Sequence, residues 1–116
     1  MKVDFKGRVR FLEPHVGGRQ HTPMLGNRSD FRYVGQTEKN VWIIWPLCFL
    51  VDGEEVPKGV HVPLEVEVGF FILDGELLES VHRHRLQPGV KFEMCEGGRT
   101  VALGEVTEVL LDDPTD

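Results

Sequence analysis

The sequence has few of the features that mark a secreted, membrane or metal-binding protein. It has only two cysteines, Cys48 and Cys95, in 116 residues. An isolated pair without a secretory leader favours free thiols over a disulfide. The most apolar run, "VWIIWPLCFLV" at 41–51, is far too short to cross a bilayer. The first residues, "MKVDFKGRVRF", lack the apolar centre of a signal peptide. These absences predict a cytoplasmic protein.

Positive charge is also in deficit. Thirteen basic residues face 19 acidic ones, which gives a formal net charge of −6. This balance disfavours a dedicated nucleic-acid binder, whose affinity rests on Lys and Arg facing phosphates. No phosphate-binding glycine loop occurs, and no nucleophile, base and orienting group can be recognised together. We therefore expect no enzyme, no bound nucleotide and no cofactor.

What the sequence has instead is a two-residue alternation of apolar and polar residues, which is typical of half-buried strands. Glycine and proline fall between the alternating runs, where turns belong. The predicted strands cover residues 2–12, 29–34, 40–51, 60–73, 76–85, 90–96 and 99–111. Many short strands with such turns predict an all-β sandwich or small barrel. We expect one domain over 1–111, followed by an acidic tail at 112–116.

Three local features refine this prediction. Asp74 and Gly75 predict a type I′ hairpin between two strands. Pro46 cannot donate a ladder hydrogen bond, so its strand lies at an edge or bends there. The apolar alternation changes phase after Val101 and Leu103, and a β-bulge at Gly104 explains the change.

Two motifs resemble a known family. "GVKFEMCEGGRTVALGEVTEVL" at 89–110 resembles the closing hairpin of the third domain of elongation factor Tu. "GGRQHTPMLGNRSDFRY" at 17–33 resembles a loop and strand of the same domain. The resemblance implies a closed antiparallel β-barrel of six to seven strands. The departures are an inserted Gln20, an additional segment around 70–81, and Cys95 in place of a basic residue. Because no GTPase motif is present, the chain looks like a free-standing third domain.

In that family the third domain contacts the T-stem of tRNA, and another face packs on a protein domain. The resemblance and the neighbouring basic residues give these candidates for RNA contact: His82, Arg83, Arg85, Gly97 and Arg99. The candidates for protein contact are Arg19, His21, Thr22, Trp42 and Trp45. We expect a non-enzymatic binding module that binds a protein partner or a second copy of itself through the former interdomain face. The alternative is RNA binding in a translation-related role.

Three features of the sequence also have a simple structural interpretation. The "EGGRT" turn at 96–100 is either only the hinge of a hairpin or also a site for a phosphate or carboxylate. His82 and His84, with Cys48 or Cys95, lack the close spacing of a strong zinc motif, so no metal site is predicted. The glutamates of the strands, such as Glu65, Glu67, Glu105 and Glu108, are expected on a solvated face.

Overall fold

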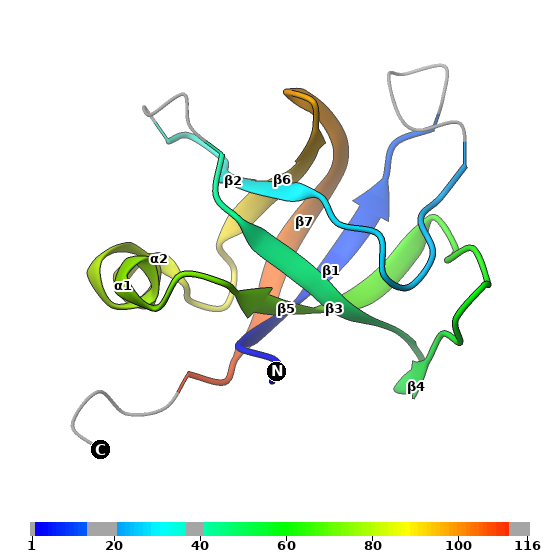
Figure 1. Cartoon of the computed structure of the whole chain (residues 1–116), viewed down its shortest axis with the longest axis horizontal. Coiled ribbons are helices and arrows are strands. Elements are labelled where there is room, and N and C mark those ends of the chain that lie inside the picture. The colour runs from blue at the N-terminus through cyan, green and yellow to red at the C-terminus, as the bar shows by residue number, and fades with distance from the viewer. Residues whose placement is uncertain (1, 14–20, 37–40, 112–116) are drawn as a thin grey trace.

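The computed structural model describes residues 2–13, 21–36 and 41–111, and it confirms the all-β prediction. These residues form one seven-stranded antiparallel sheet in the order β2-β6-β7-β1-β5-β3-β4 (Figure 1). The strands are β1 (Phe5–Phe11), β2 (Asp30–Tyr33), β3 (Ile44–Val51), β4 (Glu54–Glu55), β5 (Glu65–Ile72), β6 (Lys91–Glu96) and β7 (Arg99–Val109).

β2, at one end of the sheet, approaches the chain before β3, near the other end, without forming a continuous ladder. Among the described residues, an isolated bridge between Phe31 and Trp42 links β2 to the chain just before β3. The backbone groups of these two residues exchange hydrogen bonds of 2.9 and 2.7 Å. The sheet therefore coils round a core but is not closed by strand pairing.

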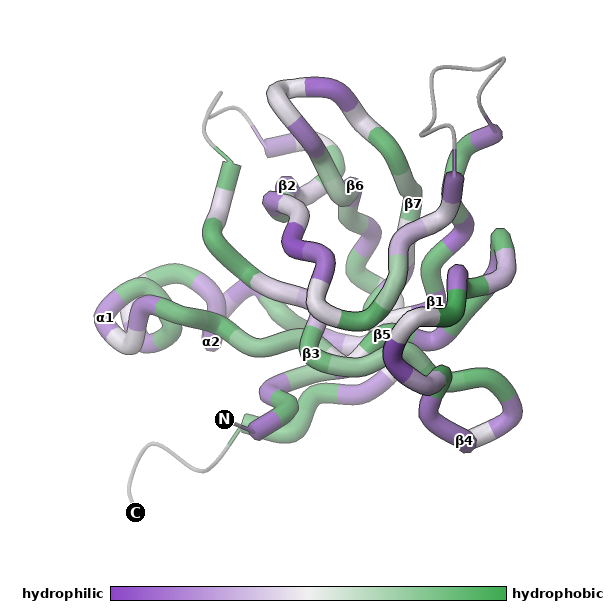
Figure 2. The backbone as a smooth tube through the Cα atoms, turned by 45° about the vertical axis from the view of Figure 1, so that its right-hand side comes forward, coloured by the Kyte–Doolittle hydropathy of each residue, from purple (hydrophilic) through white to green (hydrophobic). Residues whose placement is uncertain are grey.

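The core is a cluster of phenylalanine rings on the inner face of the coiled sheet. Phe5 stacks on Phe70 with ring centroids 4.8 Å apart, and Phe31 stacks on Phe92 at 4.7 Å. Phe70 and Phe92 meet edge to face at 5.3 Å. All four side chains are fully buried. Along the strands the hydropathy alternates as the two-residue pattern predicts (Figure 2).

β7 has two irregularities in its register, but neither lies at Gly104, where the bulge was predicted. The register shifts leave Val101 unpaired opposite β6 and Thr107 unpaired opposite β1. Gly104 is instead a packing position, because a Cβ there would lie 2.3 Å from the ring of Phe92. A Cβ on Gly7, in the adjacent strand, would lie 2.9 Å from the same ring. The two glycines thus make room for one aromatic side chain.

The predicted strand at 76–85 and its Asp74–Gly75 hairpin are also wrong. The chain instead forms one short helical segment, composed of α1 (Gly75–Leu77), η2 (Leu78–His82) and α2 (Arg83–Arg85). Its middle turn is π-helical, since the N–H of Arg83 donates to the carbonyl of Leu78, five residues earlier. In Figure 1 this segment projects from the sheet on the side away from β4.

The remaining local predictions hold in large part. The register of β3 shifts directly after Pro46, as expected of a strand that bends there. Cys48 and Cys95 are free thiols. β5 begins at Glu65 rather than at residue 60. The predicted acidic tail, 112–116, lies outside the described residues.

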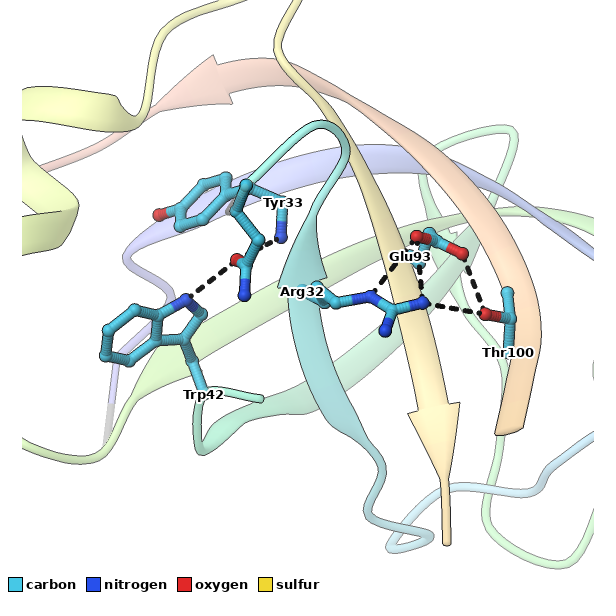
Figure 3. A network of polar contacts seen from close by, with 6 residues as sticks. Arg32, Tyr33, Trp42, Glu93 and Thr100 are labelled. Carbon is cyan, nitrogen blue, oxygen red and sulfur yellow. Dashed lines mark hydrogen bonds and ion pairs between the residues drawn. The ribbon is translucent and has the colours of Figure 1, made fainter. Parts of the chain in front are cut away.

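The outer face of the sheet carries paired charges. Arg10 lies 3.6 Å from Glu65 and Lys6 lies 4.0 Å from Glu67. Arg32 donates to Oε1 of Glu93, whose other oxygen accepts from the Thr100 hydroxyl at 2.7 Å. Figure 3 shows this second group spanning β2, β6 and β7. The strand glutamates thus lie on the outer face, where exposed pairs contribute little to stability.

Candidate functional site

The main hollow of the described structure lies where the helical segment meets the sheet. It has a volume of about 870 Å³, within the usual range for ligand sites. It lies between the chain before β3, the end of β5 and the first helical turn. Its lining residues are mostly apolar: Val41, Trp42, Ile43, Ile72, Leu73, Asp74, Gly75, Leu77 and His82.

The sequence builds one wall of this hollow by turning the chain directly from β5 into a helix. The Asp74 carboxylate caps the helix, accepting hydrogen bonds from the N–H groups of Glu76 and Leu77 at 2.9 and 3.3 Å. One turn later, Arg83 pairs with Glu79 at 2.8 Å. The helical turn between these anchors brings His82 against the sheet.

His82 is the buried polar residue of this wall, with 1% of its surface exposed. Its Nδ1 lies 2.7 Å from the hydroxyl of Tyr33, and its ring meets Trp42 edge-on at 5.1 Å. Burial, followed by the positive charge of Arg85, lowers the pKa of His82 to about 4. Burial also raises the pKa of the Tyr33 phenol. Both side chains are therefore neutral at pH 7.

Trp42 is held in place although it is only partly buried. Its Nε1 donates to Oε1 of Gln36 at 3.2 Å, and the same oxygen accepts from the backbone N–H of Tyr33 at 3.0 Å. Figure 3 shows Trp42 and Tyr33 joined through this shared acceptor. The indole thus forms a fixed apolar wall, and β2 determines its position.

The edge of the hollow exposes two large aliphatic side chains, Ile43 and Leu73, which we call the rim. Ile43 is 51% exposed and Leu73 is 45% exposed. Ile43 directly precedes β3 and Leu73 directly follows β5, next to the paired residues Ile44 and Ile72, so the two lie on neighbouring strand ends. Single exposed aliphatic residues are common, but two beside an apolar hollow form a continuous apolar surface.

The residues expected to contact RNA fall into two separate groups. His82 is buried, and so its predicted contact with RNA does not fit the described structure. Arg83 pairs with Glu79, and the guanidinium of Arg85 lies 4.2 Å above the Tyr33 ring. Gly97 and Arg99 lie at the other end of β6, about 20 Å along the strand from its start. The "HRHR" stretch is therefore not a free basic patch.

The "EGGRT" turn has the geometry of a hairpin hinge. Gly97 and Gly98 have φ values of 58° and 80°, and Glu96 pairs with Arg99 across the hairpin. Cys95 before the turn is buried, and burial raises the pKa of its thiol. Cys95 is thus an uncharged packing residue at neutral pH.

A smaller hollow of about 320 Å³ lies beside this turn. Within it the guanidinium of Arg28 lies 3.9 Å from the centre of the Trp45 ring. The side-chain amide of Asn27 donates to Glu96 at 3.4 Å. The protein's own side chains therefore already cover the indole of Trp45 and link the walls of this hollow.

The residues expected to contact protein are likewise dispersed. Arg19 lies outside the described residues. His21 is exposed, with its ring 5.6 Å from that of His61, and the carbonyl of Thr22 lies 2.6 Å from Nδ1 of His61. Of the two tryptophans, Trp42 lines the main hollow and Trp45 lines the smaller one.

Sequence reasoning missed Tyr33, Ile43, Leu73 and Leu77. For Leu73 and Leu77 the missed signal was the helix that follows β5, which the spacing of Leu78, His82 and Leu86 and the Glu79–Arg83 pair would have indicated. Tyr33 and Ile43 lie outside this helix, so that signal does not reveal them.

Across the described ranges, no three His, Cys, Asp or Glu side chains group as metal ligands. In those ranges no helix is long and apolar enough to cross a membrane. No protein-family model matches the chain.

Proposed function

We propose that this chain is a non-enzymatic binding module that binds a protein through the main hollow and its rim. The observation that carries the proposal is the exposure of Ile43 and Leu73 beside the fixed, half-buried indole of Trp42. Aromatic and aliphatic side chains around a preformed pocket are the usual anchors of protein interfaces. A partner that covers the rim removes this apolar surface from water.

The proposal includes the barrel type and the family. The Phe31–Trp42 bridge, which links β2 to the chain just before β3, supports a barrel completed at this point. The hairpin at 96–99 and the order of the two motifs support descent from a third domain like that of elongation factor Tu. The helical segment, 75–85, overlaps the additional segment around 70–81, so the hollow would be a feature of this chain rather than of the family.

RNA binding is the second candidate function, and one observation favours it. Arg99 is exposed beside Gly97 and Gly98, in a turn that leaves room for a phosphate. The net charge of −6 and the ion pair of Arg83 weigh against it. If RNA binds there, affinity falls steeply with added salt and is lost in Arg99→Glu. Binding that ignores salt contradicts this candidate.

The protein-binding proposal is tested with charged substitutions on the rim. Immobilised wild-type domain, Ile43→Glu and Leu73→Glu are compared for the proteins they retain from native lysate, with and without ribonuclease. Val60→Glu is the matched control, because Val60 is 46% exposed but lies beyond β4, away from the hollow. We expect retention by the wild type and Val60→Glu, and loss in both rim variants, whether or not ribonuclease is present.

A second copy of the chain is a partner that the same variants can reveal. Light scattering at rising concentration measures the mass of the wild type and of Ile43→Glu. A wild-type dimer that Ile43→Glu dissociates identifies the partner as a second copy. Rim variants that change neither retention nor mass would contradict the proposed function.

A further inference from the structure

One polar atom of the His82 side chain has no hydrogen-bond partner within the part of the chain that the structure describes. Nδ1 of His82 meets the Tyr33 hydroxyl at 2.7 Å, and among the described residues no group bonds to Nε2. His82 is 1% exposed and is one of the residues that line the main hollow. A buried polar atom without a partner has a free-energy cost that a ligand can remove.

The contact with Tyr33 decides which kind of partner this atom needs. Tyr33 is 2% exposed, and the described hydrogen-bond partner of its hydroxyl group is Nδ1 of His82. If Nδ1 donated to the phenol oxygen, the phenol O–H would lose its acceptor and Nε2 would be a second unpaired atom. If the phenol donates to Nδ1, both of these atoms are satisfied and only the Nε2–H is left. The second arrangement leaves fewer unpaired groups, and so Nε2 carries the proton.

We propose that the main hollow recognises an aliphatic side chain of the partner together with the adjacent backbone carbonyl, which accepts a hydrogen bond from Nε2–H of His82. Tyr33 is the positioning residue that keeps this proton on Nε2. This inference rests on the proposed function, because it names the chemistry of the partner at the same site. Trp42, Leu73 and Leu77 provide the apolar walls for the side chain.

A protein segment suits this site better than a small molecule inside the hollow. A small molecule within the hollow would cover only the parts of Ile43 and Leu73 that line it, although both side chains are about half exposed. A segment of chain enters with one side chain and covers both rim residues with its neighbours. An uncharged acceptor suits the site better than a carboxylate. The lining residues are mostly apolar and would not solvate a charged group, and the wall already includes the Asp74 carboxylate.

The test uses an uncharged probe that carries one aliphatic side chain between two amide carbonyls, N-acetyl-leucine N-methylamide. Nuclear magnetic resonance follows the Nε2–H of His82 and the indole N–H of Trp42 during titration. We expect both resonances to move and saturate together. The alanine counterpart, which lacks the aliphatic branch, should bind about tenfold more weakly. The indole of Trp45, in the other hollow, is the internal control and should not move.

Tyr33→Phe tests the positioning role without removing the donor. Both tautomers of His82 become available, so the leucine probe should bind roughly two- to tenfold more weakly. The nitrogen resonances of His82 should then show a mixture of tautomers, which a merely structural role of Tyr33 would not cause. An unchanged affinity with one unchanged tautomer would overturn the role of Tyr33.

The inference and the proposed function fail in different ways. If the leucine probe leaves the Nε2–H resonance unmoved, or moves only the Trp42 indole, the inference is overturned. The proposed function stands in that case as long as Ile43→Glu still abolishes retention of a partner. If the probe behaves as expected but the rim variants retain the partner, the proposed function fails and the hollow is a small-ligand site.

Discussion

The hydroxyl of Tyr33 lies 2.7 Å from Nδ1 of His82, which joins the sheet to the helical segment through a buried pair of neutral groups. Tyr33 belongs to β2, and His82 ends the π-helical turn. Each group meets a need of the other, because a buried phenol requires an acceptor and a buried imidazole requires a donor. The pair therefore fixes the wall of the main hollow.

The stability of the domain should fall as the pH drops from about 6.5 towards 4. Unfolded His82 titrates near its ordinary pKa of 6.5, whereas burial lowers the pKa of the folded residue to about 4. Between these values the unfolded state binds a proton that the folded state does not, so protonation favours unfolding. The contribution of His82 is fully present above pH 6.5, and about 3 kcal/mol of it is lost by pH 4. Urea denaturation at a series of pH values measures this loss.

His82→Gln is the variant that separates His82 from other titrating groups. A glutamine can still accept from Tyr33 but does not titrate, so the loss of unfolding free energy between pH 6.5 and 4 should shrink. His84→Gln is the matched control, since His84 is exposed and lies two residues further along the same segment. Equal pH dependence in the wild type and in His82→Gln would show that His82 does not control acid stability.

Gly104→Ala should destabilise the domain, because the new methyl group would lie 2.3 Å from the ring of Phe92. Phe92 is fully buried among other phenylalanines and cannot move away without disturbing them. Overpacking of this kind costs about 1–3 kcal/mol of unfolding free energy. Thermal unfolding monitored by circular dichroism measures the loss.

Gly75→Ala is the control for this substitution. Nothing lies within 4 Å of a Cβ at Gly75, which is the first residue of α1. Alanine has a higher helix propensity than glycine, so this variant should be as stable as the wild type or slightly more stable. If Gly104→Ala unfolds at the same temperature as Gly75→Ala, the packing role of Gly104 is contradicted.

The sequence predicts the sheet better than it predicts the site. Alternating apolar residues in β1, β5 and β7 indicate strands, because a half-buried strand repeats every two residues whatever lies beside it. The bulges could not be placed, since the register between β6 and β7, which leaves Val101 unpaired, is not determined by the neighbours of Val101 in the sequence. Gly104 predicted a bulge at its own position. The structure shows instead that a glycine is needed there because the ring of Phe92, on another strand, leaves no room for a Cβ.

The site could not be predicted because its main wall was assigned to the wrong element. Asp74 and Gly75 fit a hairpin as well as a helix start, and only the following residues decide between them. The contact between Tyr33 and His82 joins residues 49 positions apart, which no local pattern reveals. Trp42 was expected at an interface because it lies among apolar residues in an aromatic segment; it lines the hollow, and the interface stays a prediction.

Asp4→Ala should also destabilise the domain. The buried Asp4 carboxylate accepts from the backbone N–H of Ile72 at 2.8 Å, at the end of β5. Alanine leaves that N–H without an acceptor inside the protein, which costs about 1–3 kcal/mol. Because Ile72 lines the main hollow, the Trp42 indole resonance should shift as well.

Asp4→Asn tests whether the acceptor itself is what matters. The asparagine oxygen can accept from Ile72 in place of the carboxylate, so most of the unfolding free energy should return. Chemical denaturation of the two variants at pH 7 makes the comparison. Equal destabilisation by alanine and asparagine would mean that the negative charge of Asp4, rather than its hydrogen bond, supports the strand.

The most direct test of binding at the hollow is site-specific photo-crosslinking. The photoreactive residue p-benzoylphenylalanine replaces Ile43 in one protein and Val60 in a second, and both are irradiated in native lysate. The account predicts a discrete adduct from position 43 only, which disappears when Leu73→Glu is added. Adducts of equal yield from both positions, or an adduct from position 43 that survives Leu73→Glu, would contradict binding through the hollow and its rim.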